Sequence, residues 1–450
     1  MQVYSQIFVI SSEPEDLVFA RGLSAYSDML RKNAFGNFRD LLLDVSLHPA
    51  MGAYLNHLNN PKANTALNIF PDENYAREVM QLFSIGLLKL NPDGSYMLDE
   101  EGNTIPTYNQ SVIKNMARVF TGLSASEPCY YDDLRCDQDN YGPAWFGLDR
   151  WTINYSYPMK MYMEYHDRGE KIIFDGHRIP PGQSGIKDIE MTIDYLFRHP
   201  NVGPFIGKQL IQKMVTSNPS SEYVADITAI FNNNGQGVRG DMGAVIKAIL
   251  LHPEARDCSS LTKETHGKLQ EPLIRYFEYL KLLDIIPDKN GKIFFNNWYQ
   301  QAMGQDIYSS PSVFNFFRPD YKPTGMISEA GLVGGEFQMH NSFSALEYLS
   351  EFERMTLQGR TTSLHWMFNK PWEVYLTDDR SKLYRYARDP EAYINYLNRY
   401  FFKGGMSRET HDIMKTMFLE IGDFFSTSVD RRVNTGLMLT TMSPDFTILK

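Results

Sequence analysis

Apolar residues recur at helical spacing along most of the chain. Phe38, Leu41, Leu42 and Val45 stand at positions i, i+3, i+4 and i+7, which places them on one face of a helix. Comparable patterns predict further helices at residues 110–121, 188–198, 203–215, 222–232, 241–251, 268–283, 344–356, 390–402, 407–424 and 429–441. The pattern predicts a mainly α fold, one large multi-helix domain.

Two stretches depart from the helical pattern. Residues 91–103 contain Asn-Pro-Asp-Gly-Ser and Glu-Gly-Asn, which are typical of tight turns, and predict a turn-rich hairpin. Residues 150–180 hold two short runs rich in aromatic and β-branched residues, separated by Asp167-Arg168-Gly169. We therefore expect a small β-hairpin insertion in the helical body.

The chain of 450 residues is long enough for two or three domain-sized units, at about 150 residues each. We expect a helical core at residues 1–285, with the β insertion near 150–180. Residues 286–342 are dense in Asn, Gly, Pro and aromatic residues and predict an irregular loop region. Residues 343–450 return to the helical pattern and predict a C-terminal helical region.

Composition and charge narrow the class of protein. With 43% hydrophobic and 22% charged residues, the chain is typical of globular proteins. Acidic residues outnumber basic ones by 54 to 44, and the net charge of −10 argues against a nucleic-acid or anionic-membrane binder. The most apolar stretches, such as residues 79–88, are too short and too interrupted to cross a membrane. The opening residues contain no secretion signal as written, because they lack a basic region and a small-residue cleavage site.

The three cysteines cannot form a disulfide framework. Cys129 and Cys136 flank a short acidic and aromatic segment, where a disulfide would restrain a loop. Spacing alone does not decide between that bridge and two free thiols, since it does not show how close the Cα atoms come. Cys258 is left over in either case.

Several motifs resemble metal or phosphate sites, but the residues around each motif argue against such a site. His166-Asp167 resembles the metal-binding pair of helical phosphohydrolases but adjoins a predicted β-turn and lacks further ligands at suitable spacing. A loose set of oxygen ligands lacks the glycine and glutamate of an EF-hand: Asn91, Asp93, Ser95 and Asp99. Three His-Pro pairs read as helix joints with a partly charged imidazole at each helix end: His48-Pro49, His199-Pro200 and His252-Pro253. The sequence predicts no metal and no cofactor.

The segment with the densest chemistry reads PDENYAREVMQLFSIG, at residues 71–86. At 100° per residue, one stripe of this predicted helix is apolar and must face the core: Ala76, Val79, Met80 and Phe83. The opposite stripe is polar: Asn74, Arg77, Glu78 and Gln81. This stripe is either a solvated face with a Glu73–Arg77 pair or a polar cluster that faces a cleft.

A resemblance extends over nearly the whole chain. The run Asp72-Glu73-Asn74-Tyr75-Ala76-Arg77-Glu78 resembles the most recognisable block of the bacterial domain-of-unknown-function 1800 family. Further blocks occur in the family's order: residues 34–60, ARVFTGL at 117–123, Tyr165-His166-Asp167, residues 199–215, residues 240–256 and MSPDF at 442–446. Asp72 and Phe83 depart from the family, which often has Asn and His there, so a mechanism that needs that histidine is in doubt.

The resemblance implies an exported protein of the periplasm or the extracellular space. It implies a sulfatase-like exported partner protein, because members often occur beside such a family. Members are usually longer at the N-terminus, so we expect further helical sequence upstream of Met1 or an exposed apolar patch in its place.

Two functions remain open. The first is a binding or assembly partner in extracellular or cell-surface polymer metabolism, with a polysaccharide as a possible ligand. The alternative is a metal-independent acid/base enzyme, a hydrolase or lyase that acts on a glycan. Its candidate catalytic residues are Glu78 as acid or base, Arg77 for an anionic group, Asn74 and His57. Its candidate binding residues are Asn56, Asn59, Asn60, Glu73 and Tyr75. A cleft of this kind requires Asn74, Arg77 and Glu78 to be buried and paired with one another or with residues 56–60.

Overall fold

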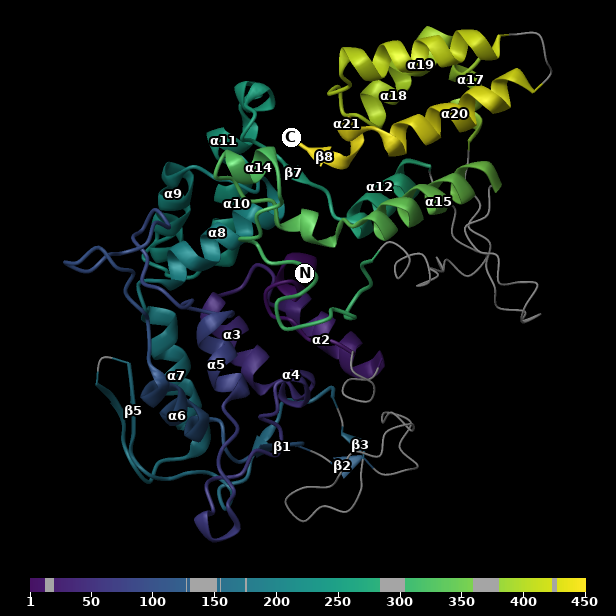
Figure 1. The fold of residues 1–450 in the computed structure, drawn as a ribbon. Coiled ribbons are helices and arrows are strands. Elements are labelled where there is room, and N and C mark those ends of the chain that lie inside the picture. The colour runs from purple at the N-terminus through teal and green to yellow at the C-terminus, as the bar shows by residue number, and fades with distance from the viewer. Residues whose placement is uncertain are drawn as a thin grey trace. The chain divides into compact units, whose positions relative to one another are not determined.

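The computed structural model describes residues 1–12, 20–126, 128–129, 152–153, 155–174, 176–283, 304–358, 380–422 and 427–450. The chain divides into two compact units (Figure 1). Unit 1 comprises Met1–His266 together with Tyr308–Asn315, and unit 2 comprises Gly267–Ile307 together with Phe316–Lys450.

Helices are the predominant regular structure in both units, which confirms the predicted mainly α fold. The described residues of unit 1 contain eleven α-helices. They are α1 (Gln2–Ser5), α2 (Ala20–Lys32), α3 (Phe38–Leu47), α4 (Pro49–Tyr54), α5 (Asn74–Gln81), α6 (Gln110–Val119), α7 (Gly185–Arg198), α8 (Val202–Met214), α9 (Ser221–Asn232), α10 (Met242–Leu251) and α11 (Pro253–Arg256). Short 3-10 helices lie at Thr65–Leu67 and Cys258–Thr262.

The core of unit 1 forms from the stripes that the sequence predicts. On α3, the side chains of Phe38, Leu41, Leu42 and Val45 are fully buried, and the apolar stripe of α5 is buried beside them. The Phe83 ring, just beyond α5, lies 5.5 Å from the ring of Phe8, centroid to centroid. The opening residues join this core: they are buried at Tyr4, Ile7, Phe8, Val9 and Ile10.

At each of the three His-Pro joints the imidazole accepts a hydrogen bond from a backbone N–H, and His48 is uncharged rather than partly charged as expected. Nδ1 of His48 accepts a hydrogen bond of 3.2 Å from the Ala50 N–H in the first turn of α4. The other two histidines accept equivalent bonds two residues ahead, from Asn201 and Glu254. A nitrogen that accepts carries no proton, and burial lowers the pKa of His48 to about 4. His48 and His252 therefore cap the following helix, whereas His199 binds the backbone of Asn201, the residue that precedes α8.

Strands are short, as expected for a small β insertion. β5 (Lys171–Ile173) and β6 (His177–Ile179) form an antiparallel hairpin in which Ile172 pairs with Arg178. β1 (Leu123–Ser124) pairs with β4 (Lys160–Met161), and β2 (Pro128–Cys129) pairs with β3 (Thr152–Ile153). Residues 87–107 form a double hairpin closed by isolated bridges at Leu88–Pro106, Leu90–Tyr96 and Leu98–Thr104. Cys136 lies outside the described residues, so a Cys129–Cys136 bridge and two free thiols both stay open, while Cys258 is an exposed free thiol.

Unit 2 has its own hydrophobic core. Its described α-helices are α12 (Pro272–Leu282), α14 (Met326–Glu329), α15 (Ser342–Gln358), α17 (Ser381–Tyr386), α18 (Pro390–Tyr400), α19 (Arg408–Ile421), α20 (Ser428–Met442) and α21 (Pro444–Thr447). β7 (Lys268–Leu269) pairs with β8 (Ile448–Leu449), and a 3-10 helix spans Gly335–Met339. Helices α18, α19 and α20 lie side by side (Figure 1), and their contact is tight because Gly436 of α20 lies against the ring of Tyr393.

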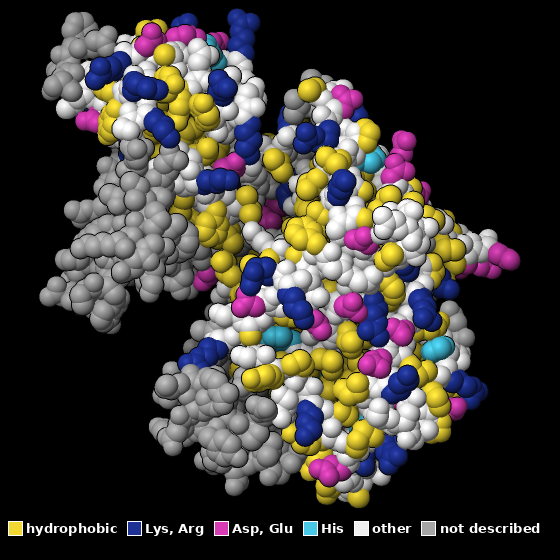
Figure 2. Space-filling view, turned by 180° about the vertical axis from the view of Figure 1, so that it is seen from behind, with side chains coloured by type: hydrophobic (Ala, Val, Ile, Leu, Met, Phe, Trp, Pro, Cys, Tyr) yellow, Lys and Arg dark blue, Asp and Glu magenta, His cyan; other side chains and the backbone are white. Residues whose placement is uncertain are grey.

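Acidic and basic side chains are interspersed over the face of the molecule shown in Figure 2. The described part of this face therefore presents a mixed electrostatic field rather than a field of one sign. None of the helices in the described ranges is long and apolar enough to span a membrane.

Candidate functional site

Helix α5 begins at Asn74 after Glu73, which forms no side-chain cap bond, and hydrogen bonds hold the residues just before the helix. The Asp72 carboxylate accepts a hydrogen bond of 2.7 Å from the N–H of Asn74. The side chain of Asn60 brackets the backbone of Asp72, since its Oδ1 accepts from the Asp72 N–H at 2.9 Å and its Nδ2 donates to the Asp72 carbonyl at 3.3 Å. The asparagine-rich turn and the start of α5 are thereby fixed to each other.

Glu78 is the one member of the predicted polar stripe with a buried side chain. Only 6% of the residue is exposed, and its Oε2 atom has no hydrogen-bond partner among the described residues. Burial raises the pKa of the carboxyl to about 7, although the charge of Arg77 partly opposes the shift. At neutral pH the group is therefore divided between its protonated and ionised forms.

Two tyrosines lie close enough to Glu78 to feel its charge. Tyr54 is the last residue of α4, and Tyr108 precedes α6. Burial and the negative charge of Glu78 raise the pKa of each phenol to about 12. The hydroxyl of Tyr108 is buried and has no partner within the described residues. We call Glu78, Tyr54 and Tyr108 the Glu78 site.

The rest of the stripe faces a different environment. Nη2 of Arg77 lies 3.4 Å from Oε2 of Glu73, with side-chain exposures of 40% and 30%. Glu73 also accepts a hydrogen bond of 2.8 Å from Nε2 of Gln110. Asn74 is half-buried. Arg77 thus forms the partly solvated i, i+4 pair with Glu73, while Glu78 lies in the interior.

His57 and Tyr75 form a second, fully buried pair. Their rings stack with centroids 3.8 Å apart, and the edge of Phe120 lies against the Tyr75 ring at 4.8 Å. The Tyr75 hydroxyl donates to Oγ of Ser46 at 2.6 Å, and Nε2 of His57 donates to the Ser46 carbonyl at 2.9 Å. Burial lowers the pKa of His57 to about 4, so the ring is neutral. Its Nδ1 is an acceptor without a partner in the described part of the chain.

The remaining predicted binding residues shape the turn after α4. Asn56 is exposed, and both Asn56 and Asn59 adopt left-handed backbone conformations, with φ of 61° and 62°. The amide oxygen of Asn59 accepts a hydrogen bond from the hydroxyl of Ser124. Among the described residues, no hydrogen bond joins the asparagines of this turn to the side chains of Arg77 or Glu78.

The geometry brings together two short segments. Tyr54 lies near Glu78, and His57 stacks on Tyr75. Residues 54–57 therefore lie beside residues 75–78 with the two segments antiparallel. This arrangement places a carboxyl that can donate or accept a proton beside two phenols. In the described ranges no group of three or more His, Cys, Asp or Glu side chains is placed to hold a metal ion.

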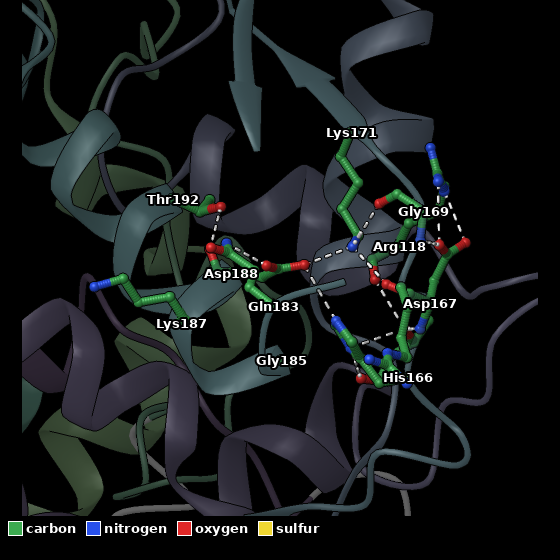
Figure 3. Close-up of polar contacts among 12 residues, drawn as sticks. Arg118, His166, Asp167, Gly169, Lys171, Gln183, Gly185, Lys187, Asp188 and Thr192 are labelled. Atoms are coloured by element: carbon green, nitrogen blue, oxygen red, sulfur yellow. Dashed lines mark hydrogen bonds and ion pairs between the residues drawn. The ribbon is translucent and has the colours of Figure 1, made fainter. Parts of the chain in front are cut away.

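A separate cluster of buried charges lies at the base of the β5–β6 hairpin (Figure 3). The Nζ atom of Lys171 contacts Oδ2 of Asp188 at 2.5 Å, and its other donors reach the carbonyls of Asp167 and Gly169. Nε2 of His166 lies 3.2 Å from the same Oδ2, and Gln183 donates to Oδ1. Burial opposes ionisation of Asp188, but the hydrogen bonds and nearby charge outweigh it and lower its pKa.

Arg118 of α6 extends this network. Its Nε and Nη2 atoms bind the two oxygens of Asp167 at 2.8 and 3.1 Å. Burial raises the pKa of Asp167, but the hydrogen bonds from Arg118 and Gly169 lower it by more, and the net pKa lies below the ordinary value. The pair His166-Asp167 is therefore bound by protein groups.

The hydroxyl of Thr121 lies 3.4 Å from Nδ1 of His166, and Nε2 of His166 contacts Asp188. Thr121, His166 and Asp188 thus follow one another as a nucleophile, a base and an acid do in a catalytic triad. That hydroxyl already donates to the Arg118 carbonyl and accepts from the Asp167 N–H. Thr121 is fully buried. We interpret the cluster as a structural clamp between the hairpin, α6 and α7.

The fold and these two sites define a mainly helical protein with a buried, partly unpaired carboxyl and a closed ion-pair clamp. The chain belongs to the family described as "Protein of unknown function (DUF1800)", whose model matches residues 1–448. The resemblance seen in the sequence is thereby confirmed over essentially the whole chain. No curated protein matches the chain, and no solved structure matches it either.

Proposed function

We propose that the protein binds a hydroxyl-rich polymer, such as a polysaccharide, at the Glu78 site. In this role it is a binding or assembly partner in extracellular or cell-surface polymer metabolism. The periplasmic or extracellular location and a sulfatase-like exported partner belong to the same proposal and are supported by the family resemblance alone.

The observation that carries the proposal is the pair of unpartnered buried polar atoms at this site. Oε2 of Glu78 and the hydroxyl of Tyr108 both lack a partner among the described residues. A buried polar group without a hydrogen bond costs about 1–3 kcal/mol, so proteins retain such groups where something else satisfies them. A ligand hydroxyl can do so, because it donates and accepts at one atom.

The acid/base enzyme remains a second candidate, and the titration of Glu78 favours it. A general acid or base works best when its pKa lies near the working pH, and that of Glu78 is about 7. Cleavage of a glycosidic bond normally needs a second carboxyl at a fixed separation. The charged side chain that acts on Glu78 within the described residues is Arg77, which supports binding over turnover.

The test is a panel of neutral and sulfated polysaccharides, measured for binding by calorimetry and for cleavage by reducing-end release. Glu78→Gln is the test variant, and Glu100→Gln is the matched control, because it removes an exposed carboxylate outside the site. We expect at least one polymer to bind, with about a tenfold loss of affinity in Glu78→Gln and little change in Glu100→Gln.

Three results would change this conclusion. Turnover that Glu78→Gln abolishes would establish the enzyme instead. Equal binding by the wild type and Glu78→Gln would remove Glu78 from the site. Failure of the whole panel to bind would contradict the proposed function.

A further inference from the structure

Three tyrosines and two arginines form a continuous row in unit 2. The rings of Tyr386, on α17, and Tyr396, on α18, stack with centroids 4.6 Å apart, and the ring of Tyr400 follows that of Tyr396 at 4.7 Å. The Cζ atom of Arg385 lies 5.1 Å from the centroid of the Tyr386 ring. The Cζ atom of Arg399 lies 5.6 Å from that of the Tyr400 ring. We call these five residues the Tyr-Arg row.

The Tyr-Arg row lies at the surface of unit 2. Tyr400 is 46% exposed, and both arginines are exposed. The rings of Tyr386 and Tyr396 are half-buried and pack against the hydrophobic core of the unit. The core therefore fixes the two inner rings, while the ends of the row are open to solvent.

Neither arginine of the row has a counter-charge in the described part of the chain. Nη2 of Arg385 donates to the Tyr386 hydroxyl at 3.4 Å, and no described carboxylate forms an ion pair with Arg385 or Arg399. A guanidinium group binds carboxylates and phosphates through two parallel hydrogen bonds, and a sulfate ester presents the same kind of negative oxygens. The row therefore offers two positive charges to an anionic ligand.

The acidic side chains of α18 are bound elsewhere. Oδ1 of Asp389 accepts a hydrogen bond of 3.0 Å from the N–H of Ala392 and caps the start of the helix. The two carboxylate oxygens of Glu391 contact His411 and Lys415 of α19, at 3.2 and 3.3 Å. Neither carboxylate thus neutralises the row, although the whole chain carries a net charge of −10.

The order of the contacts restricts the ligand. Three rings separate the two guanidinium groups, so a ligand that reaches both must be extended and must carry more than one negative group. Each ring contacts two neighbours of the row, which leaves little free ring face for the stacking of nucleic-acid bases. Tyrosine hydroxyls and guanidinium groups are suited to hydrogen bonds with sugar hydroxyls. An anionic polysaccharide meets all these requirements.

We propose that the Tyr-Arg row is a second ligand site of the protein, which binds an anionic polysaccharide. Arg385 and Arg399 bind its sulfate or carboxylate groups, and Tyr400 contacts the sugar residues between them. The inference extends the proposed function to unit 2 and rests on that function for the class of polymer. The contacts of the row themselves do not involve Glu78.

The experiment measures binding of the full chain to four polymers by calorimetry: dextran sulfate, polygalacturonate, neutral dextran and single-stranded oligothymidylate. Dextran sulfate differs from dextran in its sulfate groups, and polygalacturonate carries carboxylates instead. We expect at least one of the two anionic polysaccharides to bind more tightly than dextran and oligothymidylate. The tighter of the two identifies sulfate or carboxylate as the group that the arginines recognise.

Variants assign this binding to the row. Arg385→Gln/Arg399→Gln removes both charges and should weaken binding about tenfold, and Tyr400→Ala, which removes the most exposed ring, should weaken it as well. Arg31→Gln/Arg408→Gln is the matched control. It removes two arginines whose side chains are 75% and 96% exposed, and it changes the net charge by the same amount. The control should bind as the wild type does, and circular dichroism shows that each variant is folded.

Four results overturn the inference: equal losses in the test and control variants, equal binding of dextran and the anionic polysaccharides, tighter binding of oligothymidylate, or no binding of any polymer. Glu78→Gln separates the two sites. If Arg385→Gln/Arg399→Gln loses binding and Glu78→Gln does not, the inference stands and the proposed role of Glu78 fails. If only Glu78→Gln loses binding, the proposed function stands and the inference fails.

Discussion

Lys171 and Asp188 form a salt bridge of 2.5 Å between Nζ and Oδ2, and neither side chain is appreciably exposed to solvent. Lys171 belongs to strand β5 and Asp188 to the first turn of α7. Such a pair holds the hairpin to the helix only while both charges are present, because one buried charge alone is strongly unfavourable.

Removal of the lysine charge tests the clamp. We expect Lys171→Met to lower the free energy of unfolding by about 3–5 kcal/mol, since it leaves Asp188 buried without its main counter-charge. Lys187→Met is the matched control on α7. Lys187 is exposed and points away from the network in Figure 3, so its loss should change stability by less than about 0.5 kcal/mol. Chemical denaturation followed by circular dichroism measures both. Equal effects of the two variants would refute the clamp.

The Arg118–Asp167 pair makes stability depend on pH on the acid side. The pKa of Asp167 in the folded protein lies below the ordinary value of 3.8, so its stabilising contribution is complete above that value. The contribution disappears as the pH falls through the lowered pKa. Asp167→Asn should therefore be less stable than the wild type at pH 6, by about 1–2 kcal/mol, and the two should converge once the pH falls below the lowered pKa of Asp167. Thermal denaturation at a series of pH values shows this; a constant difference would contradict it.

Glu78 reverses the sign of this pH dependence. Its pKa is raised from 4.5 to about 7, so the folded protein binds more protons than the unfolded chain between these values. The wild type loses stability as the pH rises through this window, and the loss is complete above pH 7. Glu78→Gln should match the wild type near pH 4 and exceed its stability at pH 8 by on the order of 2 kcal/mol, with allowance for partial solvent screening. Urea midpoints at pH 4, 6 and 8 give the answer, and a more stable wild type at pH 8 would rule out a buried, unpaired carboxylate.

The packing of unit 2 predicts a steric effect at one glycine. A Cβ atom on Gly436 would come within 2.5 Å of the Tyr393 ring and 3.0 Å of Phe418. Gly436→Ala should therefore destabilise this unit by about 1–3 kcal/mol, despite the higher helix propensity of alanine. Thr435→Ala, on the neighbouring position of α20, serves as the control. A stabilised Gly436→Ala protein would show that the three helices can separate without cost.

The sequence predicts helices best where one stripe is apolar and the ends are marked. The stripe of Ala76, Val79, Met80 and Phe83 is buried as periodicity requires. Strands occur near 150–180, but the hairpin turns between Ile173 and His177 and not at Asp167-Arg168-Gly169. The sequence does not show that His48 is uncharged, because its protonation depends on whether the ring accepts a backbone N–H. The hydrogen bond from the Ala50 N–H to His48 depends on the backbone geometry of the next helix, which the sequence pattern does not give.

The site was predicted only in part, for a geometric reason. Spacing along α5 selects Glu78 together with Arg77, yet one side chain is buried while the other pairs with the partly exposed Glu73. The phenols that feel the charge of Glu78 come from Tyr54 and Tyr108, and no sequence period relates these positions to Glu78. The clamp was missed likewise, because Lys171 and Asp188 meet only after the hairpin folds onto α7.

The return of residues Tyr308–Asn315 to unit 1 also sets an order of events during synthesis. When the ribosome has made His266, the hydrogen bonds of Ser11, Ser12 and Ser27 to Tyr308 and Ser310 cannot yet form. The missing stretch begins about 40 residues later, a delay of about 2–8 s at ordinary translation rates. Closure of so long a loop also slows folding. The N-terminal unit can therefore complete its core only after Tyr308–Asn315 has been made.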